Sequence, residues 1–112
     1  MKYLLPPPLA SYFDAVNAED FDTMAGCFHA DAVVEDRGEK KTLRGRDAIR
    51  QWAEQTAKAF RFRAQVQDVD QLSDGDITVA ALVSGEFKGS PLTFTYRFTL
   101  LDSRIAALDI VL

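Results

Sequence analysis

The stretch LTFTYRFTL, residues 92–100, decides the fold because it alternates strictly between apolar and polar side chains. Side chains of a strand point in turn to opposite faces of the sheet. One face carries Leu92, Phe94, Tyr96, Phe98 and Leu100. The other carries Thr93, Thr95, Arg97 and Thr99. Because so aromatic a face must be covered, the stretch predicts a sheet packed on one side by helices.

Three further strands are predicted around this one. Residues 62–72 alternate but slip phase within residues 66–69, which predicts a bulge. The Asp-Gly turn in residues 73–76 predicts a hairpin into a strand over residues 77–87. A tight Asp-Ser turn then leads from the aromatic strand into residues 104–112. The C-terminal half is therefore expected to be four consecutive antiparallel strands.

The N-terminal half shows helical spacing instead. A first helix is expected just after Pro8, with an inward face made of Leu9, Tyr12, Phe13 and Val16. A second, short helix is expected over residues 21–28, followed by a strand over residues 29–36. A third helix is expected over residues 43–60, with an inward stripe made of Ile49, Trp52, Ala53, Thr56 and Phe60.

Together these elements predict one α+β domain over residues 1–112, with residues 1–8 as an extended N-terminal arm. The sheet is expected to be curved and mostly antiparallel, wrapped around three N-terminal helices. Its Thr-rich outer face is a candidate dimer surface.

Composition narrows the classes of function. The formal net charge is −4, which argues against a nucleic-acid or anionic-membrane partner. One cysteine excludes an internal disulfide, and with a single histidine it leaves no zinc-ligand set. The apolar run at the N-terminus stops at Leu5, which is too short for a secretion signal. A cytoplasmic protein without metal or cofactor is therefore expected.

Two segments resemble a known family. They read YFDAVNAEDFDTMAGCFHADAVVEDRG at residues 12–38 and LRGRDAIRQW at residues 43–52, and a closing hairpin at residues 97–110 fits the same pattern. The chain resembles the SnoaL-like group of the nuclear transport factor 2-like superfamily. That resemblance implies a cone-shaped sheet, a mostly apolar pocket that binds a small apolar or cyclic molecule, and a homodimer formed through the sheet. Members include isomerases, dehydratases, polyketide cyclases, epoxide hydrolases and non-enzymatic modules, so the fold alone does not identify the activity.

The front half is similar to ketosteroid isomerases, and this similarity suggests two catalytic residues. Asp36 stands where those enzymes have their general base, at the end of the first strand. Tyr12 stands where they have a tyrosine that donates a hydrogen bond to the oxyanion. Alternation separates Asp36 from Glu35, which is expected to face solvent or the dimer. The structural alternatives stay open: Asp36 as a strand-end cap and Tyr12 as a core residue.

The sequence departs from those isomerases at one point. Their second oxyanion donor, a protonated Asp on a late strand, has no counterpart in residues 92–98. Tyr96 could substitute as a donor or be part of the core. The side chains expected to line the pocket, or else to fill it, are Trp52, Phe60, Phe94, Tyr96 and Phe98.

The sequence therefore allows three functions. The first is cofactor-free isomerisation, cyclisation or dehydration by proton abstraction next to a carbonyl. The second is a non-catalytic binding or assembly module with a filled cone. The third, epoxide opening, would require Arg97 and Asp109 to face inward, although an ion pair between them is also expected. His29 is either a proton shuttle or a structural or exposed loop residue.

Overall fold

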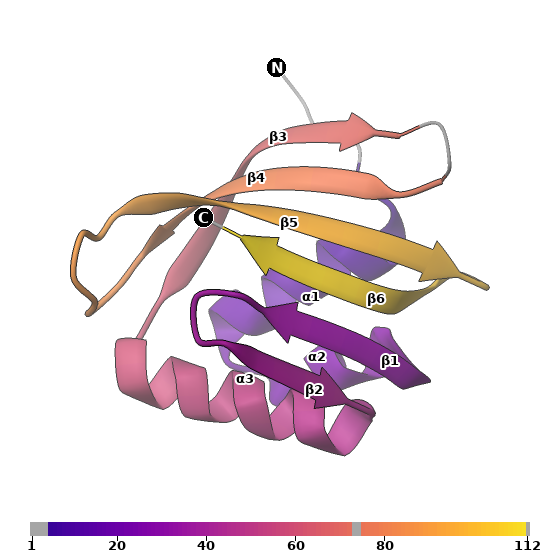
Figure 1. The fold of residues 1–112 in the computed structure, drawn as a ribbon, viewed down its shortest axis with the longest axis horizontal. Coiled ribbons are helices and arrows are strands. Elements are labelled where there is room, and N and C mark those ends of the chain that lie inside the picture. Colours follow the sequence, from indigo (N-terminus) through magenta and orange to yellow (C-terminus); the bar gives the residue numbers. More distant parts are fainter. Residues whose placement is uncertain (1–4, 73–74, 112) are drawn as a thin grey trace.

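The computed structural model describes residues 5–72 and 75–111. It contains three helices and six strands (Figure 1). The elements in chain order are α1 (Pro7–Ala18), α2 (Phe21–Gly26), β1 (Phe28–Asp36), β2 (Lys41–Arg44), α3 (Arg46–Phe60), β3 (Arg63–Gln71), β4 (Ile77–Ser84), β5 (Leu92–Leu101) and β6 (Arg104–Val111). No helix among the described residues is both long enough and apolar enough to cross a membrane.

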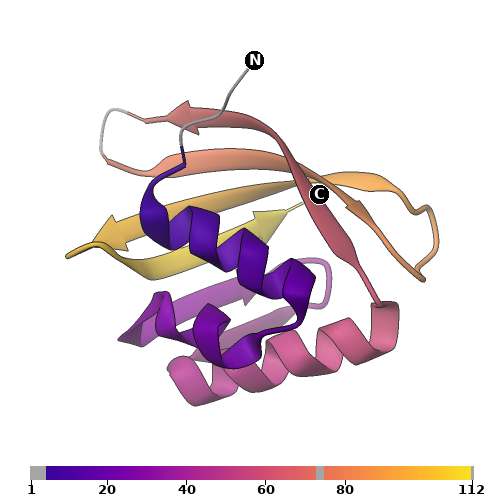
Figure 2. The same ribbon diagram turned by 180° about the vertical axis from the view of Figure 1, so that it is seen from behind.

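The six strands form one curved sheet in the order β2-β1-β6-β5-β4-β3. Neighbouring strands are antiparallel except β1 and β6, which run parallel. All three helices lie against the same face of this sheet, as the view from behind shows (Figure 2). The predicted fold class, an α+β domain with a curved and mostly antiparallel sheet around three helices, is confirmed.

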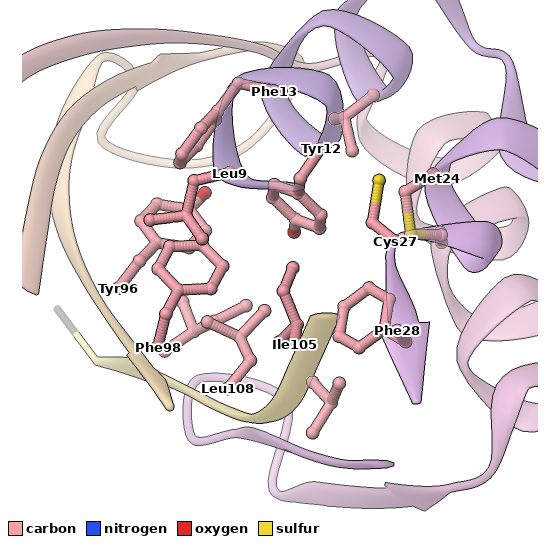
Figure 3. Packing of buried hydrophobic residues seen from close by; sticks show 14 of the residues in the cluster. Leu9, Tyr12, Phe13, Met24, Cys27, Phe28, Tyr96, Phe98, Ile105 and Leu108 are labelled. Atoms are coloured by element: carbon pink, nitrogen blue, oxygen red, sulfur yellow. The ribbon is translucent and has the colours of Figure 1, made fainter. Parts of the chain in front are cut away.

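The core forms where α1 meets the aromatic face of β5 (Figure 3). Every residue of the predicted α1 face is buried. The ring of Phe13 lies edge-on to Tyr96, with centroids 5.2 Å apart, and Tyr12 meets Phe98 at 5.6 Å. Tyr96 and Phe98 stack side by side on β5, with an interplanar angle of 9°. The alternation of residues 92–100 therefore positions the core as predicted.

The N-terminal boundary differs from the prediction. Residues 1–8 were expected to be an extended arm, but Pro7 and Pro8 form the first turn of α1. Proline suits this turn because its fixed φ is helical and its missing N–H would have no helical acceptor there. Residues 1–4 lie outside the described part of the chain. The helix ends at Ala18 and is followed by its C-cap residue Glu19, which is left-handed with φ 58°.

Two other element boundaries also differ from the prediction. α2 ends at Gly26, so Phe28 belongs to β1 and not to the predicted helix. The Cys27 carbonyl accepts a hydrogen bond from the Ile105 N–H at 2.8 Å, which already draws the chain into the sheet. α3 begins at Arg46 instead of Leu43, because the preceding residues pair with β1 as strand β2. Gly45, with φ 87°, makes the transition between them.

The C-terminal strands follow the predicted order. The β3–β4 register shifts between Val66 and Asp68, as expected for the predicted bulge. The hairpin that joins these strands includes residues 73 and 74, which lie outside the described residues. The turn between β5 and β6 consists of Asp102 and Ser103, with φ values of 51° and 64°. Positive φ at both central positions matches a type I′ turn.

Gly85 allows the chain after β4 to press against the junction of α3 and β3. The N–H of its neighbour Glu86 donates to the Phe60 carbonyl at 2.6 Å. A Cβ atom on Gly85 would stand 2.6 Å from that carbonyl oxygen and 2.9 Å from Cα of Phe62. Since both neighbours are backbone atoms, they cannot rotate away. This contact holds the chain after β4, which carries Phe87, against the junction that carries Phe60 and Phe62.

The substitution Gly85→Ala is expected to destabilise the protein by about 1–3 kcal/mol, the usual cost of overpacking. Chemical denaturation measures the effect. Gly26→Ala is the matched control, because a Cβ atom there meets no atom within 4 Å. Equal stability of the two variants would contradict the proposed backbone contact.

Candidate functional site

A cavity of about 220 Å³ lies between the helices and the sheet. It is open on one side, and most of its lining is aromatic or aliphatic. The lining residues are Tyr12, Asp36, Gly38, Glu39, Trp52, Thr56, Phe60, Phe62, Val83, Phe87, Phe94, Tyr96 and Ile110. Two carboxylates and no lysine, arginine or histidine occur among them.

The strand register explains why Asp36 and Tyr96 share this cavity. Asp36 is paired with Ile110 across β1 and β6, and Ile110 is paired with Tyr96 across β6 and β5. Residues in one such row point to the same face of the sheet. That face is the one the helices cover, so the end of β1 presents a carboxylate to the cavity in line with a tyrosine of β5.

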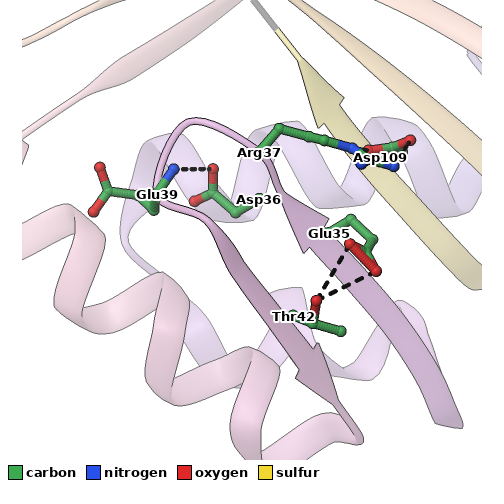
Figure 4. Close-up of polar contacts among 6 residues, drawn as sticks. All are labelled: Glu35, Asp36, Arg37, Glu39, Thr42 and Asp109. Carbon is green, nitrogen blue, oxygen red and sulfur yellow. Dashed lines mark hydrogen bonds and ion pairs between the residues drawn. The ribbon is translucent and has the colours of Figure 1, made fainter.

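Asp36 is the one polar or charged residue that is buried among the described residues, with 8% of its surface exposed. The indole Nε1–H of Trp52 donates to Asp36 Oδ2 at 2.9 Å. The backbone N–H of Glu39 donates to Oδ1 at 3.4 Å (Figure 4). The carboxylate is therefore held from two sides, by α3 and by the turn after β1. Two hydrogen bonds leave acceptor capacity on both oxygens.

Glu35 lies on the opposite face of β1, as alternation predicted. Its carboxylate accepts hydrogen bonds from the Thr42 hydroxyl at 3.2 and 3.3 Å (Figure 4). It does not line the cavity. The two adjacent acids thus occupy different environments, one enclosed with aromatic rings and the other on the outer side of the sheet.

Tyr12 and Tyr96 reach the cavity from different elements, α1 and β5, with ring centroids 6.4 Å apart. Burial raises the pKa of the Tyr12 hydroxyl well above its usual value, and the nearby Tyr96 and Asp36 raise it further. Burial, and then the charge of Asp36, likewise raise the pKa of Tyr96. Both groups are therefore neutral hydrogen-bond donors at physiological pH.

Aromatic rings surround the rest of the cavity. Phe87 meets Phe60 edge-on at 6.2 Å and Phe94 edge-on at 6.4 Å. Of the pocket residues expected from the sequence, the structure brings together Trp52, Phe60, Phe94 and Tyr96 along with Asp36 and Tyr12. Phe98 is the exception. It is fully buried under α1 and does not line the cavity, because it lies one pair of residues further along β5.

Several lining residues were missed by the sequence analysis. Phe62 precedes β3, and Phe87 follows β4 in a bend. The sequence analysis placed them at the ends of two predicted strands, residues 62–72 and 77–87, but the structure leaves both outside regular elements, since β3 begins at Arg63 and β4 ends at Ser84. Ile110 could have been found from the alternation of β6, since it follows Leu108 on the inward face. Glu39 and Gly38 come from the turn after Asp36, whose path no local pattern predicts.

The remaining candidates lie away from the cavity. Arg97 and Asp109 lie opposite each other across β5 and β6, and the charge of Arg97 contributes to lowering the pKa of Asp109, but, contrary to the expectation, the two side chains do not come within ion-pair distance. Arg97 binds Asp76 at 3.0 Å, and Asp109 binds Arg37 at 2.9 Å. Arg37 approaches from beyond β1 with two nitrogens aimed at the carboxylate, and its hydrogen bond lowers the pKa of Asp109 (Figure 4).

The side chains of His29 and Cys27 also make contacts within the protein and do not line the cavity. The His29 ring nitrogen Nε2 bonds to the Leu101 carbonyl, and the residue does not line the cavity. Cys27 is buried, its thiol donates to the Thr23 carbonyl at 3.4 Å, and burial raises its pKa. Over the described parts of the chain, no three His, Cys, Asp or Glu side chains are grouped so as to hold a metal ion.

The raised pKa values predict how stability depends on pH. An unfolded tyrosine ionises near pH 10, but Tyr12 and Tyr96 stay protonated in the folded state. Their contribution is complete below about pH 10 and is lost as the pH rises further, because the unfolded chain then releases protons that the folded chain retains. The urea midpoint is expected to fall between about pH 9 and pH 11, and to fall less in Tyr12→Phe. An equal fall in both proteins would contradict this assignment.

Comparison with known proteins places the chain in a family. Residues 9–108 match the SnoaL-like domain. A crystal structure of a candidate polyketide cyclase from Sinorhizobium meliloti superposes with a TM-score of 0.88 at 42% identity, over 95% of this chain and 94% of that one.

Two more distant structures share the fold. One is a protein of ketosteroid isomerase-like fold from Catenulispora acidiphila, in complex with trimethylamine (TM-score 0.85, 18% identity, 97% and 87% coverage). The other is an epoxide hydrolase/cyclase-like enzyme of pyran ring formation in the polyether salinomycin (TM-score 0.81, 23% identity, 94% and 87% coverage). No curated protein sequence matches the chain. The chain belongs to the SnoaL-like family.

Proposed function

We propose that the protein binds a compact apolar or cyclic molecule and catalyses a cofactor-free isomerisation, cyclisation or dehydration that begins with proton abstraction next to a carbonyl. The observation that carries this proposal is one cavity that contains both a buried carboxylate, Asp36, and a neutral hydroxyl donor, Tyr12. A base and an electrophilic donor facing one enclosed space are the parts that such a reaction requires.

Asp36 is assigned as the general base. Its carboxylate would take a proton from the carbon next to the substrate carbonyl. The electrons of that C–H bond would form a carbon–carbon double bond, and the carbonyl π electrons would move to the oxygen. Tyr12 would donate a hydrogen bond to this oxygen as its negative charge develops. The protonated Asp36 would then return the proton at another carbon or to a leaving group.

Trp52 and Glu39 line the cavity and also hold Asp36 in position. The indole N–H and the backbone N–H hold the two carboxylate oxygens in place. Fixing a base in this way reduces the reorganisation needed when the substrate arrives. Trp52 is thus a positioning residue, and its own location follows from the inward stripe of α3.

The reaction class is supported by the relatives. The protein that is 42% identical over 95% of this chain is a candidate polyketide cyclase, and the more distant salinomycin enzyme is cyclase-like. The alternative of a filled cone is less favoured, because about 220 Å³ of the cone remains open. Epoxide opening that uses Arg97 and Asp109 is disfavoured, since neither residue lines the cavity.

We also propose that two copies pair through the outer face of the sheet. Thr95, Ala107 and Val111 are only partly exposed there and are short enough for a second sheet to approach. Light scattering is expected to give twice the 12.5 kDa of one chain, and a mass of 12.5 kDa at micromolar concentration would contradict pairing.

The assignment of Asp36 is tested by hydrogen exchange into the substrate. Cyclic enones and ketones are incubated with the protein in deuterated water. They are expected to gain deuterium next to the carbonyl, and NMR measures the rate of this exchange. Asp36→Asn should lower this rate by at least about a hundredfold, as expected when a general base is lost.

Glu35→Gln is the matched control, because it removes a neighbouring carboxylate on the other face of β1. Its exchange rate is expected to match that of the unaltered protein. Equal rates in Asp36→Asn and Glu35→Gln, for a ketone that the protein does exchange, would exclude Asp36 as the base.

A further inference from the structure

The Asp36 carboxylate is enclosed without a balancing positive charge. It is 8% exposed, and its two hydrogen-bond donors, the Trp52 indole and the Glu39 backbone N–H, are both neutral. Among the described residues, no lysine, arginine or histidine side chain forms an ion pair with it. Its neighbour Arg37 binds Asp109 on the other face of the sheet instead. The cavity therefore carries a negative charge that its own walls do not neutralise.

This charge acts across the whole cavity. Burial raises the pKa of Tyr12 and of Tyr96 most, and the charge of Asp36 raises both further, although the two tyrosines come from different elements, α1 and β5. Electrostatic interactions are stronger in a poorly solvated, apolar site than in water. An enclosed carboxylate without a counter-charge is destabilising, and a cation bound nearby offsets part of that effect. The same charge disfavours an anionic ligand.

Aromatic rings form much of the wall around this charge. Phe87 stands nearly at right angles to Phe60 and to Phe94, with interplanar angles of 88° and 84° and centroids 6.2 and 6.4 Å apart. Rings at right angles can turn their faces toward one point between them. Those faces carry partial negative charge and attract a cation that lies within about 6 Å of the ring centroid. Trp52, the side-chain type with the strongest such attraction, lines the same cavity.

The walls suit an alkylated amine better than a metal ion. A metal ion requires several oxygen, nitrogen or sulfur ligands, and over the described residues no three His, Cys, Asp or Glu side chains are grouped to supply them. Walls that are mostly aromatic and aliphatic also offer few acceptors for the three N–H groups of a primary ammonium. In a tertiary or quaternary ammonium, alkyl groups surround the charge. These groups pack against apolar walls while the charge interacts with the ring faces.

We propose that this cavity binds a compact tertiary or quaternary ammonium ion, with the charged nitrogen against the rings of Phe60, Phe87 and Phe94 and with Asp36 as its counter-charge. The size is suitable, since a cavity of about 150 Å³ holds benzene and this one measures about 220 Å³. The inference goes beyond the proposed function, because it concerns the charge of the occupant and does not require proton abstraction. The nitrogen need not touch Asp36, because charges attract over several ångströms in an apolar site. The carboxylate therefore stays available to another part of the same ligand.

Choline and 3,3-dimethylbutan-1-ol test this proposal, because they have the same shape and the same hydroxyl group and differ in a single positive charge. Isothermal titration calorimetry measures both dissociation constants. The unaltered protein is expected to bind choline at least about tenfold more tightly than the alcohol. Asp36→Asn should weaken choline binding at least about tenfold without weakening the binding of the alcohol. Asparagine keeps an oxygen that accepts the Trp52 N–H, so the side chain retains this contact.

Two further variants separate the cavity from the overall charge of the protein, which is −4. Glu35→Gln removes a negative charge from the residue next to Asp36, but on the face away from the cavity. Its dissociation constant for choline is expected to stay within about twofold of the original value, because solvent screens a charge outside the cavity. Phe87→Leu replaces an aromatic ring by an aliphatic side chain. It should weaken choline binding at least about threefold and change the binding of the alcohol less.

Equal affinities of the unaltered protein for choline and for the alcohol would overturn the proposal, and so would the absence of choline binding. A loss of choline affinity in Glu35→Gln as large as that in Asp36→Asn would overturn it as well. Binding is measured without turnover, so this failure differs from failure of the proposed function. A preference for choline that depends on Asp36, with no deuterium exchange into any ketone, would support the ammonium site and reject Asp36 as the base.

Discussion

The hydrogen bond from the Trp52 indole to Asp36 is the contact on which the site depends. An unpaired carboxylate among aromatic rings would be strongly destabilising, so its burial requires a donor such as this one. The bond joins the amphipathic helix α3 to the end of β1, and a second hydrogen bond, from Arg46 to the Phe28 carbonyl, joins the two elements at their other ends. The bond from Trp52 also determines which way the carboxylate faces. The Asp36 carboxylate, the helix that supports it and the cavity that both residues line are therefore coupled through one pair of side chains.

Much of the fold could be predicted because the periodic segments are long and unambiguous. The alternation of residues 92–100 and the helical spacing of α1 each define a face, and the two faces meet in the core as expected. Boundaries were less predictable, since Pro7 and Phe28 follow local chemistry that competes with periodicity. The site residues were likewise predictable where they lie on periodic elements and not where they lie outside them. Asp36 and Tyr12 lie on periodic elements and both line the cavity, whereas Phe62 and Phe87 lie outside the regular elements.

Two features of the site could not have been obtained from one sequence. Phe94, Tyr96 and Phe98 share a face of β5, and periodicity cannot tell which of them contacts a helix and which borders a cavity. The structure divides them, because α1 covers Phe98 completely and leaves Phe94 partly exposed. The sequence could not predict the ion-pair partners across the sheet either. Asp109 has Arg97 opposite it in the strand register, yet it binds Arg37. Arg37, from the turn after β1, reaches the carboxylate in a geometry with two parallel bonds.

A crystal structure with a cyclic enone bound tests the central claim most directly, namely that Asp36 and Tyr12 act on one carbonyl compound in the cavity. The account predicts the ketone oxygen within hydrogen-bond distance of the Tyr12 hydroxyl, and an adjacent ring carbon against a carboxylate oxygen of Asp36. It also predicts that the bond between Trp52 and Asp36 persists in the complex. A ligand whose oxygen points away from the Tyr12 hydroxyl, with Asp36 remote from any carbon next to the carbonyl, would contradict it.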